Sequence, residues 1–245
     1  MMTSTVVNTV TPGTSRPDGS RHAQDPYRAP FPVADVFVRE SHIDELAYVA
    51  GVDPVDFRLG LLDDKRLAAV IQAAAGRFGW SSPGYPAGRP ALWAKGCLRR
   101  AAGIAVDLEE GRRVATCAEV RLDGAAQPCV TRIVTAYECG ALLSPDAVIR
   151  EIEAGTVMAL GSLSLSGHQV PESADPLKLD VLLIDRPDLP SAGTGQTPLT
   201  AIAPAIANAI FAATGHRLRS LTLIPAGLRM EPVSLRTAMI TPKGA

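Results

Sequence analysis

Aromatic residues and excess charge of either sign are both scarce in this sequence. Aromatic side chains make up 4% of the 245 residues, and 24 Lys and Arg residues balance 25 Asp and Glu residues, for a net charge of −1. Proteins that bind nucleic acid or anionic membranes usually carry a clear basic excess. We therefore expect neither nucleic acid nor a membrane as a partner.

Hydrophobic targeting signals are not evident either. The first thirty residues hold no apolar stretch of the kind found in secretory signals, and no later segment reads as long enough to span a membrane. From the sequence alone we expect a cytoplasmic protein.

Metal-ligating residues are few and widely spaced. The four cysteines include no C-x-x-C pair, and the four histidines are equally scattered. Structural zinc and iron–sulfur clusters need closely spaced ligands. We expect no metal held by side chains, and reduced, partly buried thiols at Cys97, Cys117, Cys129 and Cys139.

The chain divides into three regions by composition. Residues 1–34 are rich in Thr, Ser, Pro and Gly and predict a flexible N-terminal arm. Residues 35–225 carry regular apolar periodicity and predict one folded lobe. Residues 226–245 are expected to form a C-terminal tail.

The periodic segments predict an α+β fold, a mixed β-sheet with packed helices. Ser41 is expected to cap the first helix, Asp53 with Pro54 to begin the second, and Gly215 to end the last. A third helix should end near residues 76–79, and a fourth should begin at 144–146. The predicted strands are 103–108, 115–122, 130–138, 177–184 and 218–223, with a turn at 123–124.

Three longer motifs carry a resemblance to a known family. Residues 40–62 read ESHIDELAYVAGVDPVDFRLGLL, residues 138–155 read ECGALLSPDAVIREIEAG, and residues 193–215 read GTGQTPLTAIAPAIANAIFAATG. In this order they resemble the C-terminal lobe of the molybdopterin-binding subunit of the xanthine dehydrogenase/aldehyde oxidase family. Isoquinoline oxidoreductase-like and aldehyde dehydrogenase-like bacterial members are the most similar in pattern. The resemblance implies one lobe of the molybdopterin-binding domain fold.

Two departures from the family pattern bear on catalysis. The family has a glutamate after Gly-x-Gly, the general base that activates the molybdenum-bound hydroxyl, whereas this chain has Gln196. An amide keeps the shape and hydrogen bonding of a carboxylate but accepts no proton at neutral pH. Glu151 stands where the family has glutamine and offers an acid or base of its own. Gln196 and Glu151 are therefore the catalytic candidates.

Five further residues are candidates for binding a substrate or cofactor: Gly193, Thr194, Gly195, Asn208 and Glu138. The glycines would let the backbone approach an anion, although a tight loop before a helix needs them in any case. Asn208, inside an apolar helix, would equally satisfy a buried backbone group. The carboxylates of residues 107–110 would disfavour an anionic pterin phosphate nearby.

Three functions fit this pattern. The first is a truncated family member reused as a cofactor-free enzyme of cyclase, isomerase or dehydratase type, acting on a small organic molecule in the inherited cavity. The second is a subunit of a split molybdenum-dependent oxidoreductase, with molybdopterin bound only if a partner supplies the first cofactor lobe. The third is a non-catalytic assembly or regulatory protein. Because a lone lobe would expose the face that its partner covers, we also expect a homodimer or a partner subunit.

Overall fold

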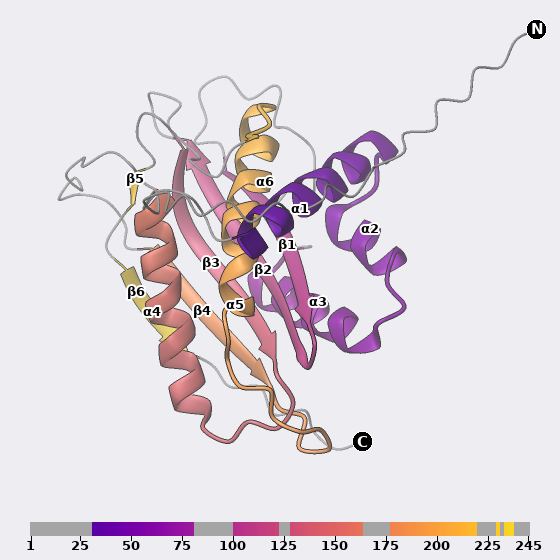
Figure 1. Ribbon diagram of the computed structural model, residues 1–245. Helices are drawn as coiled ribbons and strands as arrows, with labels where there is room; N and C mark the ends of the chain where they lie inside the picture. The colour runs from indigo at the N-terminus through magenta and orange to yellow at the C-terminus, as the bar shows by residue number, and fades with distance from the viewer. Residues whose placement is uncertain are drawn as a thin grey trace, which may run out of the picture.

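The computed structural model describes residues 31–80, 100–122, 128–163, 177–219, 229–230 and 233–237 (Figure 1). Most of the predicted arm, the cysteine at position 97 and the predicted turn at 123–124 lie outside these ranges. So does most of the strand expected at 218–223, whose first two residues are loop.

A mixed six-stranded sheet forms the centre of the molecule, so the predicted α+β class is confirmed. The strand order is β1-β2-β3-β4-β6, with β5 paired to β3. β1, β2 and β3 are antiparallel neighbours, whereas β4 runs parallel to β3 and β6 parallel to β4. The strands are β1 (Arg100–Glu109), β2 (Arg112–Leu122), β3 (Pro128–Glu138), β4 (Leu177–Ile184), β5 (Arg229–Met230) and β6 (Val233–Thr237).

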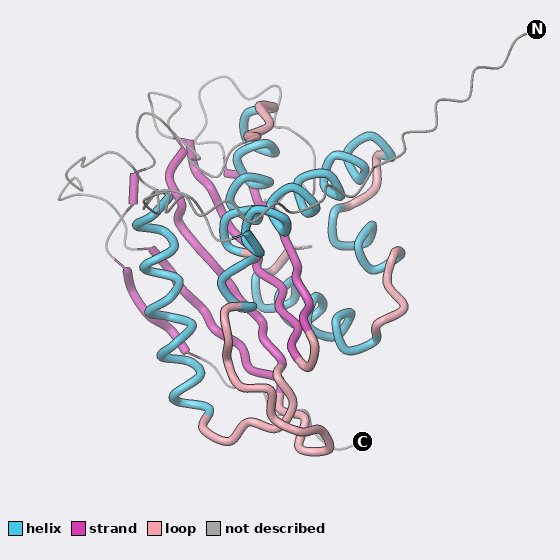
Figure 2. Tube along the Cα trace, viewed as in Figure 1, coloured by secondary structure: helices cyan, strands magenta, loops and turns pink. Residues whose placement is uncertain are grey.

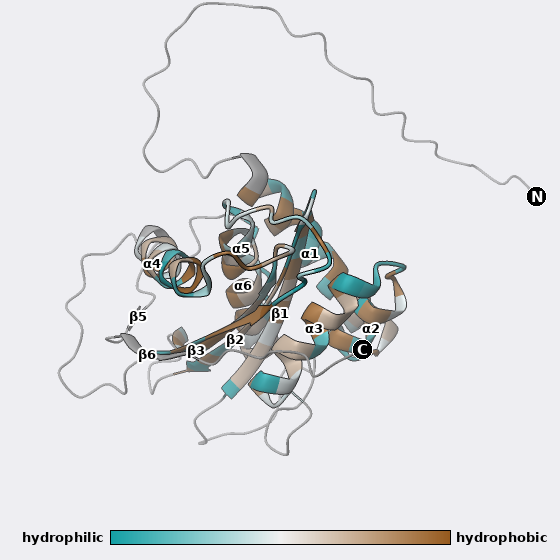
Figure 3. Ribbon diagram, turned by 90° about the horizontal axis from the view of Figure 1, so that it is seen from below, coloured by the Kyte–Doolittle hydropathy of each residue, from teal (hydrophilic) through white to brown (hydrophobic). Residues whose placement is uncertain are grey.

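Within the described ranges, six helices pack around this sheet. α3 (Lys65–Phe78) covers β2 and β3 on one face, and α6 (Ile202–Thr214) covers β1 and β2 on the other. α4 (Pro145–Leu163) lies beside α6 on the same face, as Figure 3 shows in end view. The remaining helices are α1 (Phe31–Ala50), α2 (Pro54–Gly60) and α5 (Thr197–Thr200).

The predicted helix ends are confirmed at four places and wrong at a fifth. α3 ends at Phe78 and α4 begins at Pro145, both within the predicted ranges. The Asp53 carboxylate accepts from the N–H of Val55 at 2.8 Å, so Asp53 caps α2, and Gly215 ends α6 with φ of 75°. Ser41 caps nothing, because α1 begins ten residues earlier and buries Ser41 in its middle. The helix therefore includes residues 31–34, which the composition places in the arm.

The predicted C-terminal tail contributes two strands, β5 and β6. β6 pairs with β4 from Leu177↔Val233 to Val181↔Thr237. The sequence left the order of this tail open, and in the structure pairing with β4 makes a short segment with weak alternation into a strand.

The two buried faces of the sheet explain the almost continuous apolar run along β2, β3 and β4. One core cluster contains Val114, Tyr137 and Leu183 under α4 and α6, and the other contains Cys117, Val134 and Leu182 under α3. Strands covered on both faces lose the simple apolar–polar alternation.

One apolar stretch, Thr197–Thr214, is long and hydrophobic enough to cross a membrane by length and composition. The expectation that no segment has this length was wrong. In the structure 83% of the stretch is buried inside the protein, where it forms α5 and α6 against the sheet.

Candidate functional site

The predicted Gly-x-Gly motif lies at the edge of the sheet where β3 and β4 end. Figure 2 shows three connecting segments meeting there: the turn between β1 and β2, the segment after β3 and the segment after β4. Ligand sites of sheets with parallel strands commonly lie beyond the carboxyl ends of those strands. This edge is therefore the candidate site.

The segment after β4 is fixed by backbone contacts with the segment after β3. The N–H of Ala192 donates to the carbonyl of Cys139 at 2.8 Å, and the N–H of Ala141 donates to the carbonyl of Leu189 at 3.2 Å. Gly140 has φ of 81°, and a Cβ there would lie 2.0 Å from the carbonyl oxygen of Pro190. A side chain at position 140 is therefore incompatible with this packing.

Two side chains bind the carbonyl groups of the Gly-x-Gly loop from the protein side. The Arg112 guanidinium donates to the carbonyls of Ala192 and Gly193, the latter at 3.1 Å. The Tyr137 hydroxyl lies 3.0 Å from the carbonyl oxygen of Gly193 and 2.6 Å from that of Thr194. Burial raises the pKa of Tyr137, so its hydroxyl remains a donor across the physiological range. Three consecutive carbonyls thus face inward.

The neighbouring N–H groups consequently point outward. In a trans peptide the carbonyl of one residue and the N–H of the next point in opposite directions, and none of the described peptide bonds is cis. The N–H groups of Gly193, Thr194 and Gly195 therefore face away from Arg112 and Tyr137. Within the described ranges these groups have no protein acceptor. The loop offers backbone donors to a ligand.

The two catalytic candidates are both exposed and lie on different elements. Gln196 directly precedes α5 and is exposed, with its carbonyl accepting from the N–H of Leu199 at 2.9 Å. Glu151 is exposed on α4, one turn before Gly155, the residue that packs against Leu199. α4 and α5 contact each other, so Glu151 and Gln196 are carried by neighbouring elements.

Glu138, proposed as a ligand-binding carboxylate, is engaged within the protein. It is 1% exposed and binds Arg66 through both oxygens, at 2.7 Å and 2.6 Å. It also accepts the N–H of Gly140 at 2.8 Å. Glu138 thus ties the start of α3 to the end of β3 and shapes the loop beneath the site.

Asn208 is likewise fully used inside the protein. It is 1% exposed; its amide N–H₂ donates to the carbonyl of Ile104 at 3.0 Å, and its oxygen accepts from Arg217 at 2.5 Å. The sequence left two roles open for Asn208, and the structure shows the second: its side chain satisfies a buried backbone carbonyl.

The first motif, residues 40–62, forms a buried ionic network next to Asn208. Arg58, 2% exposed, donates to the Glu40 carboxylate at 3.0 Å, and Glu40 also accepts the N–H of Val106 at 3.0 Å. Asp44 pairs with Arg217 at 2.7 Å. Burial raises the pKa of Asp44, because desolvation outweighs the attraction of Arg58 and Arg217. These charges hold α1 and α2 against β1 and take no part in the site.

Two of the carboxylates expected to disfavour an anion, those of β1, have hydrogen-bond or ionic partners. Asp107 accepts from Arg39 at 2.8 Å and from the Thr200 hydroxyl at 2.7 Å. Glu109 accepts from the Thr197 hydroxyl at 2.5 Å and lies 3.5 Å from Arg112. The charge of each carboxylate is therefore offset by a nearby donor.

The described cysteines do not offer a nucleophile. Cys117, Cys129 and Cys139 are buried and unbridged, and burial raises the pKa of Cys117 and of Cys139. Among the described residues no group of His, Cys, Asp and Glu is arranged to hold a metal ion.

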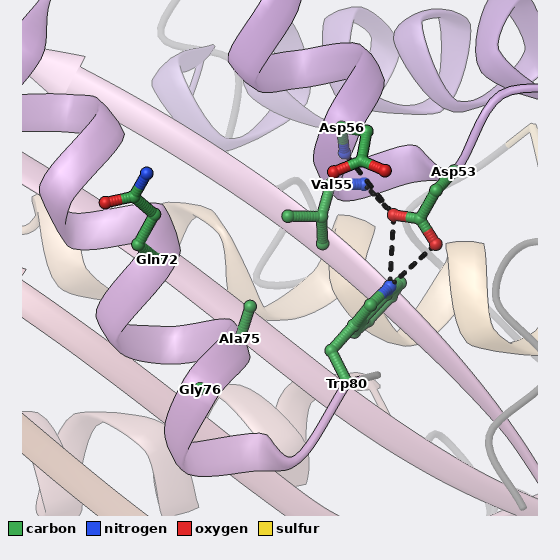
Figure 4. Close-up of a pocket in the computed structure, with 7 residues that line it drawn as sticks. All are labelled: Asp53, Val55, Asp56, Gln72, Ala75, Gly76 and Trp80. Atoms are coloured by element: carbon green, nitrogen blue, oxygen red, sulfur yellow. Dashed lines mark hydrogen bonds between the residues drawn. The ribbon is translucent and has the colours of Figure 1, made fainter. Parts of the chain in front are cut away.

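A pocket of about 270 Å³ lies between α2 and α3 (Figure 4). The Trp80 indole N–H points at the Asp53 carboxylate, at 3.0 Å from one oxygen. Sequence reasoning missed this pocket, since Asp53 was recognised only as a helix cap. Neither Gln196 nor Glu151 lines it.

Comparison with known proteins identifies the relationship. No protein-family model matches the chain. The chain is 31% identical to a nicotinate dehydrogenase subunit of Pseudomonas putida over 212 residues, 76% of this chain and 18% of that protein. It is 29% identical to the beta chain of isoquinoline 1-oxidoreductase of Brevundimonas diminuta, over 80% of this chain and 26% of that protein. Among solved structures, an aldehyde oxidoreductase from Desulfovibrio gigas matches 44% of this chain and 14% of its own, at 29% identity and a TM-score of 0.36.

The chain is thus related to the molybdopterin-binding subunits of the xanthine dehydrogenase/aldehyde oxidase family, as its three motifs predicted. It spans about a fifth to a quarter of the length of these curated relatives.

The site residues fit one side of a molybdopterin site. Molybdopterin carries phosphate and oxo oxygens that accept hydrogen bonds, and the outward N–H groups of the loop supply donors beside the Gln196 amide.

Proposed function

We propose that this chain forms one wall of a molybdopterin site in an oxidoreductase, with the rest of the site supplied by another lobe. The observation that carries the proposal is the inward orientation of three loop carbonyls, which turns the N–H groups of Gly193, Thr194 and Gly195 outward. These groups and the Gln196 amide would hold the cofactor. When bound, the molybdenum centre would supply the redox and hydroxyl-transfer chemistry.

The exposure of the site supports a second lobe. Gln196 and Glu151 both lie on the surface, so a substrate placed against them would remain open to water. Another subunit or a second copy of the chain would close the site. The relatives named for nicotinate and isoquinoline suggest an N-heteroaromatic substrate.

Gln196 would orient the substrate by hydrogen bonds and would not remove a proton. Loss of a general base costs about 10²–10⁴-fold in rate. In this proposal the proton goes to another group, and Glu151 is an exposed carboxylate that could accept it.

A cofactor-free enzyme is the second candidate, and the replacement of the base by Gln196 favours it. In that case Glu151 would act on a small organic molecule as an acid or base, and Gln196 would orient that molecule by hydrogen bonds. The surface position of both residues again calls for a covering partner.

Substitution at position 196 separates the two candidates. Wild type, Gln196→Glu and Gln196→Ala would be tagged in the organism that encodes the chain and assayed with nicotinate and isoquinoline and a dye acceptor. The molybdenum proposal predicts that Gln196→Glu raises the hydroxylation rate by about 10²-fold or more over Gln196→Ala, since it restores a carboxylate base. Folded proteins without molybdenum and without dye reduction in all three variants would overturn the proposal and leave the cofactor-free enzyme as the candidate.

A further inference from the structure

We propose that Arg112 and Tyr137 are positioning residues that set the orientation of the peptides in the Gly-x-Gly loop. With its N–H groups turned outward, the loop can bind an anionic ligand. The inference rests on the proposed function for the ligand but on geometry alone for the orientation. Neither residue belongs to the three motifs that identify the family relationship. We call these two side chains and the carbonyls that they hold the carbonyl clamp.

The clamp joins parts of the chain that lie far apart in sequence. Arg112 begins β2 and lies 81 positions from Gly193, whose carbonyl it binds, and Tyr137 lies near the end of β3, 57 positions from Thr194. Both strands belong to the core sheet, so the donors are held by rigid elements while the loop itself is exposed. A loop fixed in this way presents its N–H groups before any ligand arrives, which lowers the cost of ordering on binding.

The turn between β1 and β2 connects the clamp to α5. Glu109 lies 3.5 Å from the Arg112 guanidinium and accepts the Thr197 hydroxyl at 2.5 Å. Arg112 is thus oriented by a carboxylate that also binds the first residue of α5. A Cβ on Gly195 would lie 3.0 Å from the guanidinium, so residue 195 must be small for Arg112 to keep its place.

The positive charge of Arg112 gives the loop a preference for anionic ligands. The guanidinium lies directly behind the loop, and its positive charge adds to the partial positive charges of the three outward N–H groups. An oxyanion or a phosphate would be favoured there over a neutral or cationic group.

Nuclear magnetic resonance of the full chain tests the orientation without any cofactor. In wild type the amide hydrogens of Gly193, Thr194 and Gly195 should exchange rapidly, whereas that of Ala192, bonded to Cys139, should exchange at least about tenfold more slowly. In Arg112→Ala the cross-peaks of residues 193–195 should shift or split as the peptides reorient. Arg112→Lys should restore part of the wild-type pattern, because one donor returns.

Arg113→Ala is the matched control. Arg113 is the next residue in β2 but binds Asp64 at the start of α3, at 2.8 Å. Its substitution should leave the cross-peaks of residues 193–195 in place and move those around Leu67. Unchanged loop cross-peaks in Arg112→Ala, or equal shifts in Arg113→Ala, would overturn the clamp.

Metal content provides the second measurement and separates the two proposals. Protein isolated from the native organism should lose at least about tenfold in molybdenum occupancy in Arg112→Ala relative to Arg113→Ala, the effect of one charge-assisted hydrogen bond or more. If wild type itself carries no molybdenum, the proposed cofactor fails while the spectra still decide the clamp. If wild type is loaded and Arg112→Ala stays equally loaded, the role of the clamp in binding fails.

Discussion

Replacing Gly140 by alanine should loosen the whole edge of the sheet at which the site lies. Gly140 has φ of 81°, and an added Cβ would lie 2.0 Å from the Pro190 carbonyl oxygen, far inside van der Waals contact. The left-handed conformation alone costs about 1–2 kcal/mol for a residue with a Cβ. Relief of the overlap requires the segment after β4 to move.

The free energy lost through that movement follows from the backbone hydrogen bonds that it would break. Two backbone hydrogen bonds span the contact, Ala192 N–H to Cys139 at 2.8 Å and Ala141 N–H to Leu189 at 3.2 Å. At about 1 kcal/mol each they add about 2 kcal/mol. We therefore expect Gly140→Ala to lower the free energy of unfolding by about 3–4 kcal/mol, measured by urea denaturation followed by circular dichroism.

Gly51→Ala is the control for backbone conformation. Gly51 has φ of 66°, similar to Gly140, but a Cβ there would meet no atom within 4 Å. Its substitution should cost only the conformational part, about 1–2 kcal/mol. Equal losses in Gly51→Ala and Gly140→Ala would refute the steric reasoning, because the contact with Pro190 would then contribute nothing.

Two further predictions concern charged groups below the site and in the helical layer. Arg66→Ala should lower the free energy of unfolding by about 2–3 kcal/mol in urea titrations, because it leaves the buried Glu138 carboxylate without its cation; a loss below about 0.5 kcal/mol would show that the pair is not structural. For Asp44, whose pKa is raised by burial, the folded state binds the proton more tightly than the unfolded state, so this group favours folding below pH of about 4 and the contribution is lost as pH rises through the folded pKa. The stability of wild type relative to Asp44→Asn should therefore fall as urea midpoints are taken from pH of about 4 upward, and a rise would contradict the assigned direction.

Local signals in the sequence predicted the fold class and several helix ends. The caps at Asp53 and Gly215 depend on neighbouring residues only, so they could be recognised from the sequence. β6 could not, because a five-residue strand is stabilised by its partner β4, more than fifty positions away. The start of α1 was missed for the same reason, since its residues are ordered by packing against α6 and β1.

The site shows the same division between local and distant information. The Gly-x-Gly loop, Gln196 and Glu151 were recognised as candidates, and the structure exposes Gln196 before α5 and Glu151 on α4, two helices that contact each other. The arginines that pair with Glu138 and with the loop carbonyls lie 72 and about 80 positions away from them, and no sequence pattern indicates such pairs. The sequence could not tell which polar residues of the motifs are buried and bonded within the protein and which are exposed; the structure was needed for that.

Molybdenum content tests the central claim most directly. The chain would be isolated by an affinity tag from the organism that encodes it, with any partner proteins that remain attached, and examined by elemental mass spectrometry and pterin fluorescence. We predict about one molybdenum and one pterin for each copy of the chain, together with a second lobe or subunit. A folded protein without molybdenum or pterin would contradict the claim and favour the cofactor-free enzyme.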